Sequence, residues 1–180
     1  MNPKAKNCWL AISFLFAIAP LAISQDAKSD FDPAKDLSAL KTYAFAPLSP
    51  SDPLSSHPDT AQKIKADLSS QLQQIGLQEN AAHPDFLVSY SASKHTYSST
   101  YGSGASGWTS GNEVWTSSYQ VGMLVVDFLD PSSQQPFWRG TAEKTIFGGD
   151  FKKYVPKGVE RLVQAFREDR AKQSKRSTAK

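Results

Sequence analysis

Cysteine is almost absent from this sequence, which has 180 residues and a single cysteine at position 8. One cysteine excludes a disulfide framework and any cysteine-rich metal site. Histidine is scarce too, and His57, His83 and His95 do not form the closely spaced pairs of a metal clamp. We therefore expect neither a bound metal ion nor a cofactor.

Motifs for phosphate binding and nucleophilic catalysis are also missing. A Gly-x-Gly-x-x-Gly pattern formed by Gly102, Gly104 and Gly107 follows no tight strand and opens no helix, so it does not indicate a nucleotide site. The serines among these glycines lack the spacing of a nucleophile elbow. A formal net charge of +3 is too weak to indicate nucleic-acid binding. We assign no catalytic residue from motifs and expect no nucleic-acid partner.

The N-terminus has the pattern of an export signal. Lys4 and Lys6 precede an apolar run over residues 9–23, and small residues end that run at Ser24. This arrangement predicts a signal peptide over residues 1–24, cleaved before Gln25. The run is shorter than the roughly 20 residues that a membrane-spanning helix needs. Retention of the segment as an uncleaved anchor is the alternative.

Cleavage would place the mature chain in the periplasm or outside the cell. It would also remove Cys8, and a cysteine-free domain tolerates an oxidising compartment. A lipoprotein signal needs a cysteine just after the apolar run, whereas Cys8 lies before it. The sequence therefore predicts an exported protein that is not a lipoprotein and has no transmembrane span once mature.

Hydrophobic periodicity over residues 25–166 predicts one α+β domain. Residues 56–77 and about 150–170 each carry an apolar stripe with helical spacing, and residues 120–129 alternate as a strand. Both faces of that strand are apolar, so we expect it to be central and covered on both sides. The order strand–helix–strand–strand–strand–helix favours a two-layer sandwich with a mixed sheet of four to five strands. Another strand is optional at its start.

A segment at about residues 91–118 is rich in serine, threonine and glycine, with little charge. We interpret it as a long polar loop. Its aromatic residues suggest a partner-binding surface, because flat rings add contact area at low entropic cost. The alternative is a mobile hairpin loop whose rings fold back on the sheet. The candidate binding residues are Tyr97, Tyr101, Trp108 and Trp115.

Two carboxylates offer a catalytic alternative. Asp85 and Asp127 could serve hydrolysis of glycan or ester bonds if they faced each other across a pocket. Both more readily have structural roles, because Asp85 begins a strand and Asp127 lies near the end of a buried one. Residues 167–180 are basic and polar, and we expect them to be a disordered tail.

Five short motifs resemble the domain-of-unknown-function 4136 family of bacterial exported envelope proteins. The resemblance covers roughly residues 30–166 and implies an envelope location, but no activity. Members of this family are often lipid-anchored, and the missing cysteine after the apolar run departs from that pattern. The motifs are Asp30-Phe31-Asp32, Lys41-Thr42-Tyr43-Ala44-Phe45, Pro84-Asp85-Phe86-Leu87-Val88-Ser89-Tyr90, Gly122-Met123-Leu124-Val125-Val126-Asp127 and Phe137-Trp138-Arg139-Gly140-Thr141-Ala142.

Taken together, the sequence favours a non-catalytic binding or interaction module of the cell envelope. Its partner would be an envelope protein, a glycan or a lipid component. A periplasmic hydrolase using Asp127 or Asp85 is the alternative, and a domain that only spaces the envelope is a third reading.

The export signal can be tested on the protein recovered from cells. We expect N-terminal sequencing and intact mass to show a chain beginning at Gln25, because the small residues before it fit the cleavage site. A chain that still begins at Met1 would identify the segment as a retained anchor.

Overall fold

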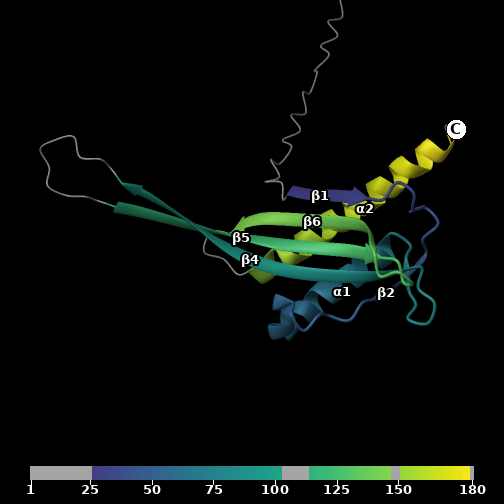
Figure 1. Cartoon of the computed structure of the whole chain (residues 1–180), viewed down its shortest axis with the longest axis horizontal. Helices are drawn as coiled ribbons and strands as arrows, with labels where there is room; N and C mark the ends of the chain where they lie inside the picture. The colour runs from purple at the N-terminus through teal and green to yellow at the C-terminus, as the bar shows by residue number, and fades with distance from the viewer. Residues whose placement is uncertain (1–25, 103–113, 147–150, 179–180) are drawn as a thin grey trace, which may run out of the picture.

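The computed structural model describes residues 26–102, 114–146 and 151–178. A six-stranded sheet forms one layer, and both α-helices lie against one of its faces (Figure 1). The elements are β1 (Asp26–Phe31), β2 (Thr42–Phe45), η1 (Pro53–Ser56), α1 (Pro58–Gln74), β3 (Gln78–Glu79), β4 (Phe86–Gly102), β5 (Val114–Leu129), β6 (Pro136–Ile146), η2 (Phe151–Lys153) and α2 (Val155–Thr178).

The sheet is mixed, with the strand order β1-β6-β5-β4-β2-β3. Antiparallel pairing joins β1, β6, β5 and β4, whereas β2 runs parallel to both β4 and β3. This arrangement confirms the predicted α+β class. The number of strands is larger than the four to five expected, because the two-residue strand β3 is too short to show any periodicity.

The predicted apolar stripes of the two helices form the core with the facing side of the sheet. Ile64, Leu68 and Leu72 of α1 are fully buried, as are Val159 and Phe166 of α2. These side chains contact alternate residues of β4, β5 and β6, because every second side chain of a strand points to the same face. The shared core includes Phe86, Phe128 and Trp138.

Trp138 is the largest fully buried side chain. Its ring stacks on Phe128 at 4.7 Å between centroids and meets Phe166 edge-on at 5.4 Å. Gly140 makes room for this packing, since a Cβ there would lie 2.9 Å from both Leu162 Cδ2 and Trp138 Cζ3.

The expected loop at about residues 91–118 is instead two paired strands over much of its length. Residues 91–102 belong to β4 and residues 114–118 to β5, and their register is unbroken from Leu87–Leu129 to Gly102–Val114. Threonine and tyrosine favour strands, and uncharged serines do not interrupt them. The hydroxyl-rich composition had suggested a loop, but continuous pairing satisfies the backbone donors and acceptors.

Helices cover β5 on one face rather than on both. Leu124, Val126 and Phe128 are buried beneath the helices, whereas Val121, Met123 and Val125 on the opposite face are only partly buried. We call this opposite side of β4, β5 and β6 the open face. The apolar pattern of β5 thus predicts its central position but not how its second face is covered.

Residues 167–178 belong to α2 and are not a disordered tail. Polar side chains of its later turns hold the N-terminal part of the domain. Gln173 accepts the backbone N–H of Leu37 at 2.7 Å and donates to the carbonyl of Lys35 at 2.6 Å. Arg170 donates to the carbonyl of Leu40 at 3.2 Å. Hydrogen bonds of polar side chains do not produce a periodic apolar pattern. The sequence of residues 167–178 therefore resembles that of a solvated terminus.

Asp169 is the buried centre of this attachment, with 4% of its surface exposed. Its carboxylate accepts the Ser29 hydroxyl at 2.7 Å and the Trp138 indole N–H at 3.2 Å, and it pairs with Lys172 at 3.3 Å. It therefore joins α2 to β1 and β6. Removing such a buried acceptor lowers the free energy of unfolding, because its hydrogen-bond donors are left without a partner.

We expect Asp169→Ala to lower the free energy of unfolding by about 1–3 kcal/mol, since it orphans the Trp138 indole N–H and the Ser29 hydroxyl. Glu168→Ala is the matched control on the adjacent, exposed residue. Urea unfolding of both variants measures the difference. Equal stability of the two variants would show that Asp169 does not hold α2 to the sheet.

Candidate interaction surface

β4 and β5 extend beyond the rest of the sheet as a two-stranded ribbon. The last pairing of β5 with β6 joins Gln120 to Ile146, but β4 and β5 stay paired for six further positions. We call this ribbon, residues 97–102 with residues 114–119, the arm. Figure 1 shows it projecting well past both helices.

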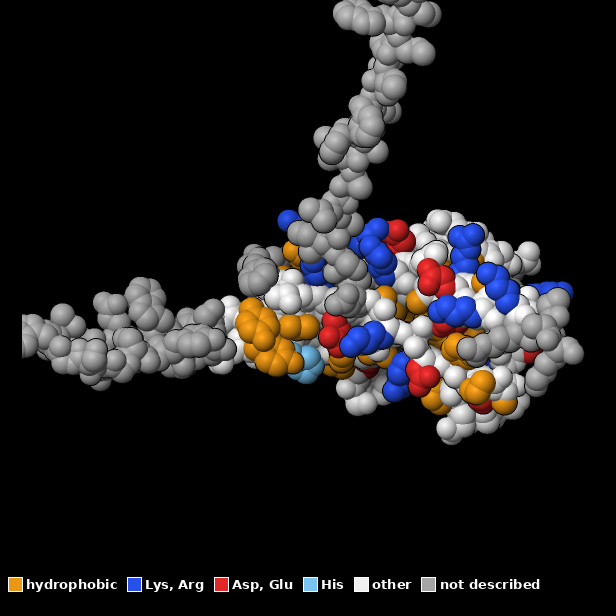
Figure 2. All heavy atoms as spheres, turned by 90° about the horizontal axis from the view of Figure 1, so that it is seen from above, with side chains coloured by type: hydrophobic (Ala, Val, Ile, Leu, Met, Phe, Trp, Pro, Cys, Tyr) orange, Lys and Arg blue, Asp and Glu red, His pale blue; other side chains and the backbone are white. Residues whose placement is uncertain are grey.

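Two tyrosines on the open face mark the base of the arm. The rings of Tyr97 and Tyr119 stack at 5.3 Å between centroids, with 15° between their planes. They are half-exposed, at 50% and 37%. Figure 2 shows hydrophobic side chains gathered where the arm leaves the domain. Such a cross-strand pair stabilises the ribbon and still presents aromatic surface to solvent.

The structure describes three of the four aromatic candidates. Tyr97 lies on the exposed stack, and Tyr101 stands opposite Trp115 in the strand register. Trp108 lies outside the described residues. Tyr119 was missed by sequence reasoning, because its partnership with Tyr97 depends on the β4–β5 register and not on sequence spacing.

Asp85 is held in a structural role. One of its carboxylate oxygens accepts the backbone N–H groups of Lys41 and Thr42 at 2.9 and 2.8 Å. These hydrogen bonds hold the pKa of Asp85 below its usual value of 3.8. A carboxyl group of this kind stays ionised and connects the start of β4 to β2, so it is poorly suited to donate a proton.

Asp127 is likewise committed to a partner. Arg139 on the neighbouring strand donates two hydrogen bonds to its carboxylate, at 2.6 and 2.8 Å. His95 is on the same face but six residues along β4 from Ser89, which faces Asp127. At the rise of a strand, this is a separation of about 20 Å. The register therefore does not bring His95 to Asp127, and the Asp85 carboxylate binds Lys41 and Thr42 instead.

Metal ligands are not grouped in the described ranges: no three histidine, aspartate or glutamate side chains come together there. A groove of about 440 Å³ does lie between α1 and α2. Ile75 and Val163 contribute apolar surface, and Lys157 pairs with Glu160 at 2.9 Å beside it.

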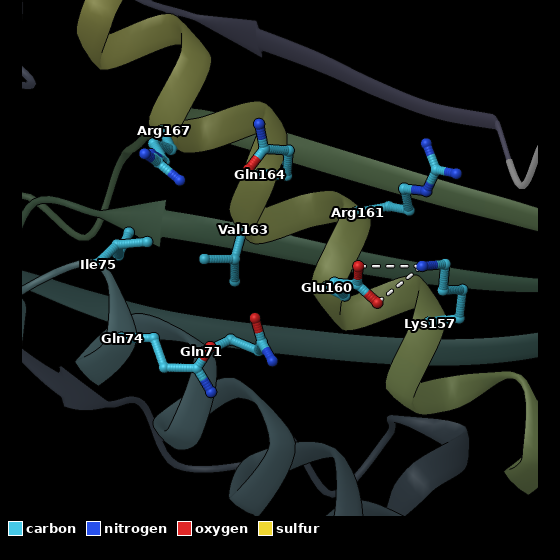
Figure 3. Close-up of a pocket in the computed structure, with 9 residues that line it drawn as sticks. All are labelled: Gln71, Gln74, Ile75, Lys157, Glu160, Arg161, Val163, Gln164 and Arg167. Atoms are coloured by element: carbon cyan, nitrogen blue, oxygen red, sulfur yellow. Dashed lines mark hydrogen bonds and ion pairs between the residues drawn. The ribbon is translucent and has the colours of Figure 1, made fainter. Parts of the chain in front are cut away.

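The polar groups of this groove do not converge. Figure 3 shows the guanidinium groups of Arg161 and Arg167 extending toward different ends of it. Charges spread along an open groove are solvated and screened by salt. We therefore place the candidate contact surface on the arm and not between the helices.

The family model described as "Domain of unknown function (DUF4136)" matches residues 27–166. The chain belongs to this family. The match spans all of the sheet except the start of β1, together with α1 and the first half of α2. Among curated proteins, none matches the sequence significantly.

Solved structures resemble this chain at low sequence identity. A PDZ domain protein from Parabacteroides distasonis is 12% identical with a TM-score of 0.55, over 78% of this chain and 35% of that one. The chain thus spans about a third of that protein. A DUF4136 family protein from Bacteroides thetaiotaomicron is also 12% identical, with a TM-score of 0.41 over 81% of this chain and 95% of that one.

A minor lipoprotein from Acinetobacter baumannii is 12% identical with a TM-score of 0.37, over 74% of this chain and 95% of that one. In the described part of the present chain, neither helix is long and apolar enough to cross a membrane.

The hydrogen bonds of Asp85 predict a pH-dependent contribution to stability. Folding lowers the pKa of this carboxyl, so its contribution is present above the unfolded-state pKa near 3.8 and is lost as the pH falls through the lower folded-state value. We expect Asp85→Asn to reduce stability at neutral pH, and we expect this deficit to disappear as the pH falls below the folded-state pKa of Asp85.

Urea unfolding across this pH range measures the effect, with Glu143→Gln, an exposed site on β6, as the control. A deficit for Asp85→Asn that stays constant down to the lowest pH would contradict the assigned role.

Proposed function

We propose that this protein is an exported, non-catalytic interaction module of the cell envelope that binds a protein partner through its arm. The exposed Tyr97–Tyr119 stack, on a ribbon that projects beyond both helices, carries this proposal. The export signal of the sequence and the family resemblance support the envelope location.

The arm needs a partner for a physical reason. Two-stranded ribbons are marginally stable in water unless a third strand or a helix covers them. Here β6 ends at Ile146, and both tyrosines remain half-exposed. A partner that covers the rings would bury aromatic surface with little loss of side-chain freedom, because tyrosine has few rotatable bonds.

A protein fits the arm better than a glycan or a lipid does. The ribbon offers strand edges whose backbone donors and acceptors are available, and another polypeptide strand matches that row of groups. Lys94 is the only lysine, arginine, aspartate or glutamate between residues 91 and 102, so docking there desolvates little charge.

Catalysis has no comparable support in the described residues. Asp85 and Asp127, the carboxylates of the hydrolase alternative, each bind a structural partner. Neither lines the groove between the helices. We therefore propose binding, and not hydrolysis, as the function.

Site-specific photo-crosslinking in living cells tests this proposal. A photoreactive side chain at position 97 should form a covalent adduct with a protein, because that position lies at the centre of the proposed contact. The same group at Glu143, exposed on β6 of the same sheet face, is the control. We expect several-fold more adduct from position 97. Equal yields, or no protein adduct from position 97, would contradict the proposal.

A further inference from the structure

Beyond Val88, no described strand pairs with the outer edge of β4, although the short helix η1 packs against part of this strand. β2 pairs with β4 only at Phe86, Leu87 and Val88, and the last hydrogen bond runs from the Ala46 N–H to the Val88 carbonyl at 2.9 Å. β4 then continues to Gly102. From there on, its only partner strand is β5, on the other side.

The direction of the backbone groups along this edge follows from the register. The Val88 carbonyl points toward β2, and in an antiparallel ladder alternate residues point to alternate edges. Because the β4–β5 register is unbroken, the N–H and C=O groups of Lys94, Thr96 and Ser98 point away from β5. Within the described part of the chain, no hydrogen bond reaches these outward groups.

Little on the edge protects it from pairing. Natural proteins block open edges with charged side chains, proline or bulges. Between Tyr90 and Gly102 there is no proline, the register shows no bulge, and Lys94 is the only lysine or arginine. A long edge of this kind is a template for another strand.

We propose that the partner at this edge is a second copy of the chain, paired through β4 in antiparallel register about a two-fold axis at Tyr97. This inference rests on the proposed function, because it names the partner of the same arm. The two sheets would join into one continuous sheet. Symmetric pairing of one surface with itself is the commonest way in which soluble proteins form dimers.

The tyrosine stack favours this register. Tyr97 lies on β4, the strand with the unpaired edge, and stacks on Tyr119 of the neighbouring strand β5. In the paired edge, Tyr97 would face the partner's Tyr97 at a position without mutual hydrogen bonds, where side chains approach most closely. A ladder of four rings would result, with a Tyr119 at each end.

The charges on the edge agree with the same register. Pairing centred on Tyr97 places Lys94 opposite the partner's Thr100, and Thr96 opposite the partner's Ser98. The two Lys94 residues would then be six positions apart, or about 20 Å. At that separation, which is beyond a Debye length, their repulsion is largely screened. The chain is thus complementary to itself along this edge.

Sedimentation of the purified full chain, with Thr96→Pro as the test variant, examines the pairing. Thr96→Pro removes an outward N–H and leaves β4–β5 bonding intact, since proline is tolerated where the N–H faces away from the sheet. Ser118→Pro is the matched control, because its N–H points outward from the opposite edge of the same arm. We expect dimers for the unsubstituted chain and for Ser118→Pro, and monomers for Thr96→Pro.

Cysteine trapping tests the register in a Cys8→Ala background that contains no other cysteine. Tyr97→Cys should form a disulfide-linked dimer, because facing residues without mutual hydrogen bonds have Cα atoms about 4.5 Å apart. His95→Cys should not, since its counterpart would lie four positions away, at about 13 Å.

A monomeric unsubstituted chain at all concentrations, dimers that survive Thr96→Pro, or trapping at position 95 instead of 97 would each overturn this inference. A different result would contradict the proposed function. If position 97 crosslinks to a different protein while the purified chain is monomeric, the arm is still a binding surface and only the second copy is wrong. If no protein adduct forms, both are wrong.

Discussion

The unbroken antiparallel register between β4 and β5 is the constraint on which the rest of this structure depends. It directs Leu124, Val126 and Phe128 toward the helices, which builds the core beneath α1 and α2. Farther along the hairpin, the same register places Tyr97 opposite Tyr119 and directs the N–H and C=O groups of alternate β4 residues to its outer edge. The core and the proposed contact surface therefore lie at opposite ends of one hairpin, and a register slip of one residue would move the side chains of both to the opposite face of the sheet.

The two ends of this hairpin are stabilised differently. Near β2 and β6, aromatic packing around Trp138 and polar bonds to Asp169 fix the sheet against α2. Beyond Gln120, the described residues add only the second strand and the Tyr97–Tyr119 stack. A two-stranded ribbon that is covered so little is only marginally stable by itself, and a bound partner would stabilise it. This contrast supports interaction, and not catalysis, as the role of the arm.

Sequence patterns predicted the elements that bury apolar side chains at regular spacing. The stripe through Ile64, Leu68 and Leu72 and the alternation in β5 were both visible in this way. Other features had no such signal. The arm looked like a loop because its serines and threonines do not alternate with apolar residues, and Tyr119 gained its importance only from the register. The late turns of α2 are held by Asp169, Arg170 and Gln173, whose polar bonds create no apolar stripe.

Residue-resolved hydrogen exchange along β4 tests the central claim most directly. Along residues 94–98 of β4, the amides of His95 and Tyr97 point toward β5, whereas those of Lys94, Thr96 and Ser98 point to the outer edge. Our account predicts that the inward amides are protected at every concentration, and that the outward amides gain protection as the protein concentration rises. Outward amides that exchange at the rate of an unfolded chain at all concentrations would contradict pairing at this edge. Inward amides without protection would contradict the arm itself.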